Sequence, residues 1–174
     1  HIPSPAEVMT QIIQRVERTQ IETVYSDIRL LTDDIASCYK FLLTKLYDAG
    51  CRYVQFDGVH SVIMEDTIRL NNRVLRERPA GMYVAFHAPT DMLVQLHGAD
   101  AYFLNYDCGA CDRNRLLWFI HEKEAVFGFV LSHYPQEDEL DELQAKTESV
   151  LNYIPLKRFT LCLPDANALL SPSE

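Results

Sequence analysis

Two cysteines separated by two residues form the pattern in this sequence that most directly suggests chemistry. Cys108 and Cys111 follow an apolar run at 101–107 and precede a segment of moderate helical character at 112–120. A C-x-x-C pair between a strand and a helix is typical of thiol oxidoreductases, in which the helix N-terminus lowers the pKa of the first thiol. Nothing else in the chain resembles a thioredoxin, so redox chemistry ranks third among the functions considered. The pair could also bind zinc, or be two reduced thiols without a role.

Three further residues that could do chemistry fall in or at the ends of predicted strands. Catalytic groups of parallel α/β proteins lie just beyond the C-terminal ends of the strands, and Asp57 and His87 occupy such positions. A histidine together with cysteine thiolates is a common zinc-ligand set. One candidate set is His87 with Cys108, Cys111 and Cys162. Asp57 has two interpretations: a residue of a binding pocket, or a cap for the segment that follows.

The elements that would position these residues alternate along the chain. Strands are predicted at 51–57, 82–88, 101–107, 125–132 and 158–163. Helices are predicted at 5–18, 32–49, 62–77, 91–97 and 136–154. Strands that are almost continuously apolar are typical of a parallel sheet buried on both faces. The sequence therefore predicts an α/β fold in a single domain, 1–174, with about five parallel strands and outer helices.

The predicted helices carry more detailed expectations. Thr32 is predicted to cap the helix at 32–49, and Gly50 to end it. The apolar residues of this helix share one face, which predicts a buried stripe of Ile35, Tyr39, Leu42, Leu43 and Leu46. The same spacing in the first helix predicts a buried face of Val8, Ile12, Ile13 and Val16. Cys38 and Cys51 are expected to be buried apolar residues.

Composition restricts the class of protein and its partners. Sixteen basic against 25 acidic side chains give a net charge of −9, opposite in sign to that of a nucleic-acid binder. No apolar run approaches the roughly 18 residues of a membrane span. Five dispersed cysteines and the lack of a signal-peptide pattern at the start predict reduced thiols and a cytoplasmic location. Because the chain starts at His1, we expect a fragment, a processed form or a trimmed form.

Four segments resemble the C-terminal catalytic barrel of the cobalamin-independent methionine synthase family, especially its shorter bacterial members. They occur in the family's order: YDAGCRYVQFD (47–57), YFLNYD (102–107), VFGFVLSHYPQEDELDELQAK (126–146) and NYIPLKRFTLCLPDA (152–166). The resemblance implies a TIM (β/α)8 barrel. It also implies 5-methyltetrahydropteroyltriglutamate–homocysteine S-methyltransferase activity in methionine biosynthesis, with a zinc-bound homocysteine thiolate and a methyl-folate as reactants.

The zinc ligands that the resemblance implies are largely replaced. His87 stands at the family's histidine, but Pro89, Asn105 and Ala166 stand where the family has cysteine, glutamate and cysteine. Proline and alanine offer zinc no ligand, and an amide is a poor one. By resemblance, Asp57 is the aspartate that holds the substrate's amino group, although its acidic neighbour in the family is glycine here. We therefore expect absent or weak zinc, and the alternative function is a non-catalytic or changed-substrate relative that binds a small thiol or amino acid.

Length conflicts with a complete barrel. A (β/α)8 barrel needs about 250 residues, whereas this chain has 174. We expect part of a barrel. The remaining strands lie outside this chain, are missing from internal segments of it, or come from a second copy in a homo-oligomer.

Overall fold

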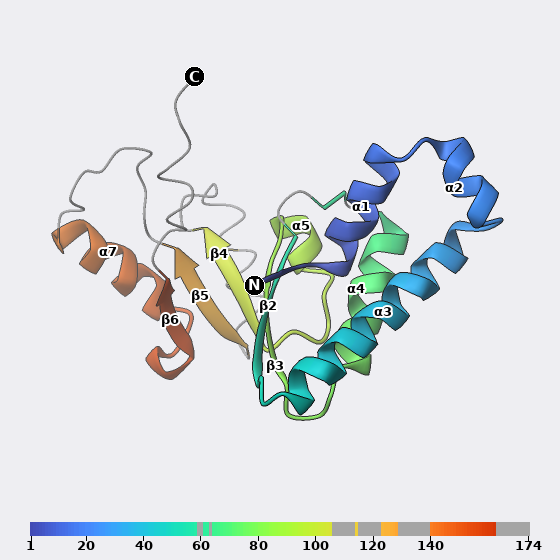
Figure 1. Ribbon diagram of the computed structural model, residues 1–174. Helices are drawn as coiled ribbons and strands as arrows, with labels where there is room; N and C mark the ends of the chain where they lie inside the picture. Colours follow the sequence, from blue (N-terminus) through green and yellow to red (C-terminus); the bar gives the residue numbers. More distant parts are fainter. Residues whose placement is uncertain (59–60, 63, 106–113, 115–122, 129–139, 163–174) are drawn as a thin grey trace, which may run out of the picture. The chain divides into compact units, whose positions relative to one another are not determined.

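The computed structural model describes residues 1–58, 61–62, 64–105, 114, 123–128 and 140–162. The chain forms two compact units, 1–100 and 101–174, and the elements of both are shown in Figure 1. The first unit contains β1 (Ile2–Pro3), α1 (Pro5–Arg15), α2 (Arg18–Val24), α3 (Ile28–Asp48), β2 (Tyr53–Asp57), α4 (Glu65–Glu77), β3 (Tyr83–His87) and α5 (Thr90–Leu93). The second contains β4 (Ala101–Asn105), β5 (Glu124–Gly128), α7 (Leu140–Leu151), a 3-10 turn (Leu156–Arg158) and β6 (Phe159–Cys162).

Every strand pair within each unit is parallel. In the first unit β2 pairs with β1 on one side and with β3 on the other. In the second unit β5 pairs with β4 and with β6. Parallel neighbours need a crossover between them, which α3 and α4 provide in the first unit. The predicted α/β fold with parallel strands is confirmed, whereas β1, which has only two residues, was not predicted.

The side chains of β2 and β3 divide between two faces of the sheet. Phe56 and Phe86 are fully buried and lie edge to face, with ring centroids 5.6 Å apart. Tyr39 of α3 packs against Phe56 at 5.7 Å, so α3 covers this face. Because successive residues of a strand point to opposite sides, Asp57 and His87 lie on the other face. The packed face therefore holds the backbone of β2 and β3, and the polar side chains of Asp57 and His87 lie on the opposite face.

Helix α3 starts earlier than the sequence predicts. It begins at Ile28 because Asp27 is its N-cap, accepting a hydrogen bond from the Arg29 N–H at 2.9 Å. The prediction that Thr32 caps this helix is wrong, since the Thr32 hydroxyl donates to the Ile28 carbonyl inside the helix. Gly50 ends the helix as predicted, with a φ of +95° that a side chain would disfavour.

The buried faces of the first helices also differ from the predicted ones. The helix predicted at 5–18 is confirmed as α1, which ends three residues earlier, at Arg15. Its predicted buried face is wrong, since Ile13 is 39% exposed. The side chains that α1 buries are instead those of Pro5, Ala6, Glu7, Met9 and Thr10. In α3 the buried stripe is Leu31, Ile35, Ala36, Tyr39 and Leu43, and Leu42 is 39% exposed. The predicted burial of two cysteines is wrong as well, because Cys38 is exposed and Cys51 half-buried.

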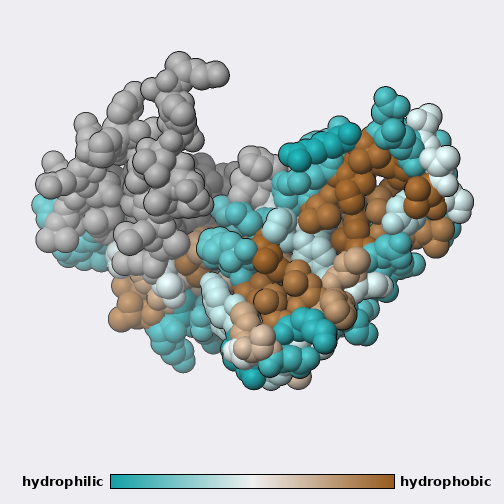
Figure 2. Space-filling model, in the orientation of Figure 1, coloured by the Kyte–Doolittle hydropathy of each residue, from teal (hydrophilic) through white to brown (hydrophobic). Residues whose placement is uncertain are grey.

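Exposed apolar side chains gather between α1, α2 and the start of α3. Figure 2 shows this hydrophobic surface, and a groove of about 440 Å³ lies there, lined in part by Ile13, Ile21 and Ile28. No side chain of α2 is buried. In the part of the chain that the structure describes, no helix is both long and apolar enough to cross a membrane.

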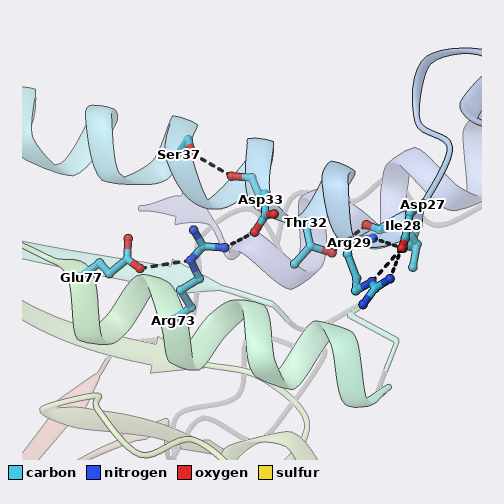
Figure 3. A network of polar contacts seen from close by, with 8 residues as sticks. All are labelled: Asp27, Ile28, Arg29, Thr32, Asp33, Ser37, Arg73 and Glu77. Atoms are coloured by element: carbon cyan, nitrogen blue, oxygen red, sulfur yellow. Dashed lines mark hydrogen bonds and ion pairs between the residues drawn. The ribbon is translucent and has the colours of Figure 1, made fainter.

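An arginine joins α3 to α4. Arg73 forms ion pairs with Asp33 of α3 and, through Nε at 3.1 Å, with Glu77 of its own helix (Figure 3). Arg69, by contrast, pairs only within α4, with Glu65, and both side chains are largely exposed. Of these two arginines, only Arg73 forms an ion pair between two helices.

Replacing Arg73 by methionine should lower the free energy of unfolding by up to about 1 kcal/mol, because partly exposed ion pairs contribute little. Urea denaturation measures the change, and about 1 M NaCl should reduce it. The matched variant Arg69→Met should lose less. A loss at Arg73 no larger than that at Arg69 would show that the interhelical pair does not stabilise the fold.

Candidate functional site

Asp57 and His87 lie side by side at the C-terminal ends of neighbouring parallel strands. The two residues are opposite each other in the β2–β3 register. His87 Nδ1 lies 3.1 Å from Asp57 Oδ1, and the two side chains are 37% and 44% exposed. The structure therefore brings together the two predicted site residues that it fully describes.

One oxygen of the Asp57 carboxylate is buried without a hydrogen bond. The His87–Asp57 contact meets the distance of an ion pair, yet Oδ1 receives no hydrogen bond from any described group. A carboxylate oxygen in such a position is costly unless a donor completes it. An ammonium group is a suitable donor, because it offers three N–H bonds and a positive charge.

Backbone hydrogen bonds fix the strand ends that carry this pair. The Asp57 carbonyl accepts from the Ser4 N–H at 2.6 Å, which joins β2 to the residue after β1. The Gly58 N–H donates to the His87 carbonyl at 2.7 Å, which joins β2 to β3. The backbone at the end of β2 is thus hydrogen-bonded to the residue after β1 on one side and to β3 on the other.

A buried polar group that the sequence analysis missed lies beside Asp57. Its members are Ser4, Glu7 and Ser61, called here the Ser–Glu group, and all three are buried. Ser61 Oγ donates to Glu7 Oε2 at 3.3 Å and lies 3.3 Å from Ser4 Oγ. The Ser4–Glu7 spacing is the S-x-x-E pattern of a helix start, which was the signal available in the sequence.

Tyr39 connects β1 to the core, where it packs against Phe56. Its hydroxyl donates to the Pro3 carbonyl at 2.6 Å. Burial raises the pKa of Tyr39 above its ordinary value of 10.0, and the Glu7 carboxylate raises that pKa further. The folded chain therefore keeps this proton where the unfolded chain has lost it.

This pKa shift predicts a stability loss at alkaline pH. The contribution of Tyr39 is fully present below the unfolded pKa of about 10 and is lost as pH rises above it. The unfolding free energy measured in urea should therefore fall more steeply between about pH 9 and 11 in the wild type than in Tyr39→Phe. The variant should be less stable at neutral pH by about 1 kcal/mol, because it lacks the hydrogen bond to Pro3. Parallel pH curves for the two proteins would contradict the assignment.

The other predicted ligands are only partly described. Cys108 and Cys111 lie outside the described residues, and so does Ala166. Cys162 ends β6 and Asn105 ends β4, but the structure describes only their backbone. The C-x-x-C pair and the zinc site of His87 with these three cysteines therefore stay predictions.

The described donors at the strand ends do not fit the zinc site that the family resemblance implies. His87 supplies one imidazole, and Pro89, which precedes α5, offers only a carbonyl that already accepts from the Met92 and Leu93 N–H groups. Among the residues with described side chains, no three His, Cys, Asp or Glu side chains lie close enough to hold a metal.

Comparison with known proteins supports the fold. No protein-family model matches the chain. The chain is 23% identical over 190 residues to the uncharacterized protein YxjH of Bacillus subtilis (strain 168), a match that covers 87% of this chain and 50% of that protein. It also resembles the solved structure of a Listeria monocytogenes protein assigned as a vitamin-B12 independent methionine synthase. In that match the TM-score is 0.69 at 24% identity, covering 93% of this chain and 54% of that one.

These matches establish the fold and not an activity. The chain spans about half the length of both proteins. The predicted likeness to part of a methionine synthase barrel is confirmed at the level of fold. The substrates, metal and location that the resemblance implies stay proposals.

Proposed function

We propose that this chain is a methionine-synthase-like protein that binds a small amino-acid thiol such as homocysteine. Asp57 receives the ammonium group of the ligand at the C-terminal ends of β2 and β3. The observation that carries the proposal is the buried Asp57 Oδ1, which has no hydrogen bond from a described group although the side chain is half exposed. Asp57 ends a parallel strand, and parallel α/β proteins bind ligands at the C-terminal ends of their strands, which supports the proposal.

The His87 imidazole lies beside the Asp57 carboxylate. Its Nδ1 lies against Oδ1, so a ligand ammonium would complete an acceptor that the imidazole already approaches. The proposal does not include methyl transfer through the zinc site of the family. Pro89 and Ala166 carry no zinc ligand, and the Asn105 amide is a poor one.

Calorimetric titration with L-homocysteine under reducing conditions tests the binding proposal. We expect binding by the wild type and about tenfold weaker binding by Asp57→Asn, because that variant loses the charged partner of the ammonium. The control ligand is 4-mercaptobutyrate, which keeps the thiol and the carboxylate but lacks the amino group. Its affinity should be the same for both proteins. Equal affinity of the wild type for the two ligands would contradict the role of Asp57.

Zinc content separates this proposal from an active methyltransferase. Protein purified without chelator should hold clearly less than one zinc per chain. One zinc per chain, together with methylation of homocysteine by a methyl-folate, would instead establish the family's reaction and favour the relocated site of His87, Cys108, Cys111 and Cys162.

A further inference from the structure

Only one of the two hydrogen bonds of a capping box forms at the start of α1. In a capping box the N-cap side chain accepts from the third residue's N–H, and the third residue's carboxylate accepts from the N-cap N–H. Ser4 makes the first of these bonds, accepting from the Glu7 N–H at 3.1 Å. The Ser4 N–H does not reach Glu7 but donates to the Asp57 carbonyl at 2.6 Å. The Glu7 carboxylate is therefore available for another partner.

That partner is Ser61, which follows β2 in the chain. Ser61 Oγ donates to Glu7 Oε2, and a serine hydroxyl has only one proton to donate. The 3.3 Å contact between the two serine hydroxyls must therefore use the proton of Ser4. Hydrogen bonds run from the Glu7 N–H to Ser4, from Ser4 to Ser61, and from Ser61 back to the Glu7 carboxylate. This closed ring ties the start of α1 to the chain beyond Asp57.

Further contacts hold the same stretch of chain. The Val62 N–H donates to Thr10 Oγ1 of α1 at 3.0 Å, and the Ser61 N–H donates to the Gly58 carbonyl at 3.1 Å. Gln11 Nε2 donates to the other oxygen of Glu7 at 3.1 Å, so both carboxylate oxygens have donors.

We propose that Glu7 is a positioning residue for the Asp57 carboxylate, which binds the ligand. Through Ser61 it fixes the chain that leaves β2, and it thereby sets the position of Asp57 relative to His87. The identity of the ligand rests on the proposed function, but the positioning role rests on the hydrogen-bonded ring and can be tested without a ligand.

The ligand-free test uses nuclear magnetic resonance of the full chain. In Ser61→Ala and Glu7→Ala, the side-chain resonances of His87 should shift, because the carboxylate beside the imidazole moves. The amide of Val62 should also exchange with solvent about tenfold faster. Glu7→Gln keeps one acceptor oxygen and should shift less than Glu7→Ala. Unchanged His87 resonances in a folded Ser61→Ala protein would overturn the proposal.

The matched control is Ser37→Ala. Ser37 lies on α3 and its hydroxyl donates to the Asp33 carbonyl of the same helix, so its loss should leave the His87 resonances and the Val62 exchange unchanged. An equal response in this control would show a general loss of stability, which also overturns the positioning role.

The ligand test measures how strongly the chain prefers L-homocysteine over 4-mercaptobutyrate. Ser61→Ala should reduce this preference severalfold, and adding it to Asp57→Asn should cause no further loss, because both changes act through one carboxylate. Additive losses would overturn the proposal. Equal wild-type binding of the two ligands would refute the proposed function alone, and the resonance and exchange measurements would still decide the role of Glu7.

Discussion

Replacing Arg78 by methionine is expected to lower the free energy of unfolding by about 3 kcal/mol. The Arg78 side chain is 18% exposed, and its guanidinium pairs with Asp100, with Nη2 at 2.9 and 3.1 Å from the two carboxylate oxygens. It also donates to the Met82, Leu75 and Gly98 carbonyls at 3.0, 2.8 and 2.5 Å. Methionine fills much of the same volume but satisfies none of these acceptors, so the loss is one of polar contacts rather than of packing.

The partner Asp100 allows a cycle of variants. Its carboxylate also accepts from the Val84 N–H at 2.8 Å, so it would stay partly paired when Arg78 is replaced. Urea denaturation of Arg78→Met, Asp100→Asn and the double variant should show a double loss clearly smaller than the sum of the single losses. The control Arg18→Met removes an arginine that is 90% exposed and should cost less than about 1 kcal/mol. A loss at Arg78 no larger than at Arg18 would contradict the assignment.

The positions of Asp57 and His87 could be predicted because they depend on local patterns. Each ends an apolar run, and two parallel runs bring their C-terminal ends to one edge. The contact between them then follows from the register, in which the two residues are opposite. The alternation of apolar and amphipathic segments was thus enough to place both residues at strand ends, and the family resemblance singled them out.

The Ser–Glu group could not be found in this way. Hydrophobic periodicity assumes that the buried face of a helix is its apolar face, but α1 buries Glu7 and Thr10 and leaves Ile13 partly exposed. The polar partners of Glu7 and Thr10 follow β2, more than fifty residues away in the chain. No local pattern contains that pairing, so the sequence predicted the wrong face.

The start of α3 shows a second limit of local patterns. Both Asp27 and Thr32 are good N-cap residues, and the aspartate pair after Thr32 favoured the later start. Asp27 is the N-cap because its backbone is extended and its carboxylate also binds the Arg29 side chain. These contacts cannot be read from the residue types alone.

Replacing Gly58 by alanine is expected to destabilise the fold by about 2 kcal/mol, through steric overlap rather than backbone strain. A Cβ on Gly58 would lie 2.6 Å from Ser4 Oγ and 2.9 Å from Ser61 Oγ, well inside normal contact. Both hydroxyls belong to the ring that holds Glu7, so they cannot move away without breaking its hydrogen bonds. The overlap should also reduce the preference for homocysteine, because Gly58 directly follows Asp57.

Gly50 provides the matched control, because it has a φ of +95° but no atom within 4 Å of an added Cβ. Gly50→Ala should therefore cost about 1 kcal/mol from backbone conformation and leave ligand preference unchanged. Gly58→Ala combined with Ser61→Ala should regain part of the stability lost in Gly58→Ala, since one of the two overlaps is removed. If the combined variant is instead less stable by the sum of the single losses, the close approach of Ser61 is not the cause. The same crowding accounts for Gly58 at a position where the methionine synthase family has an acidic residue. Ser4 and Ser61 occupy the space that a larger side chain would need.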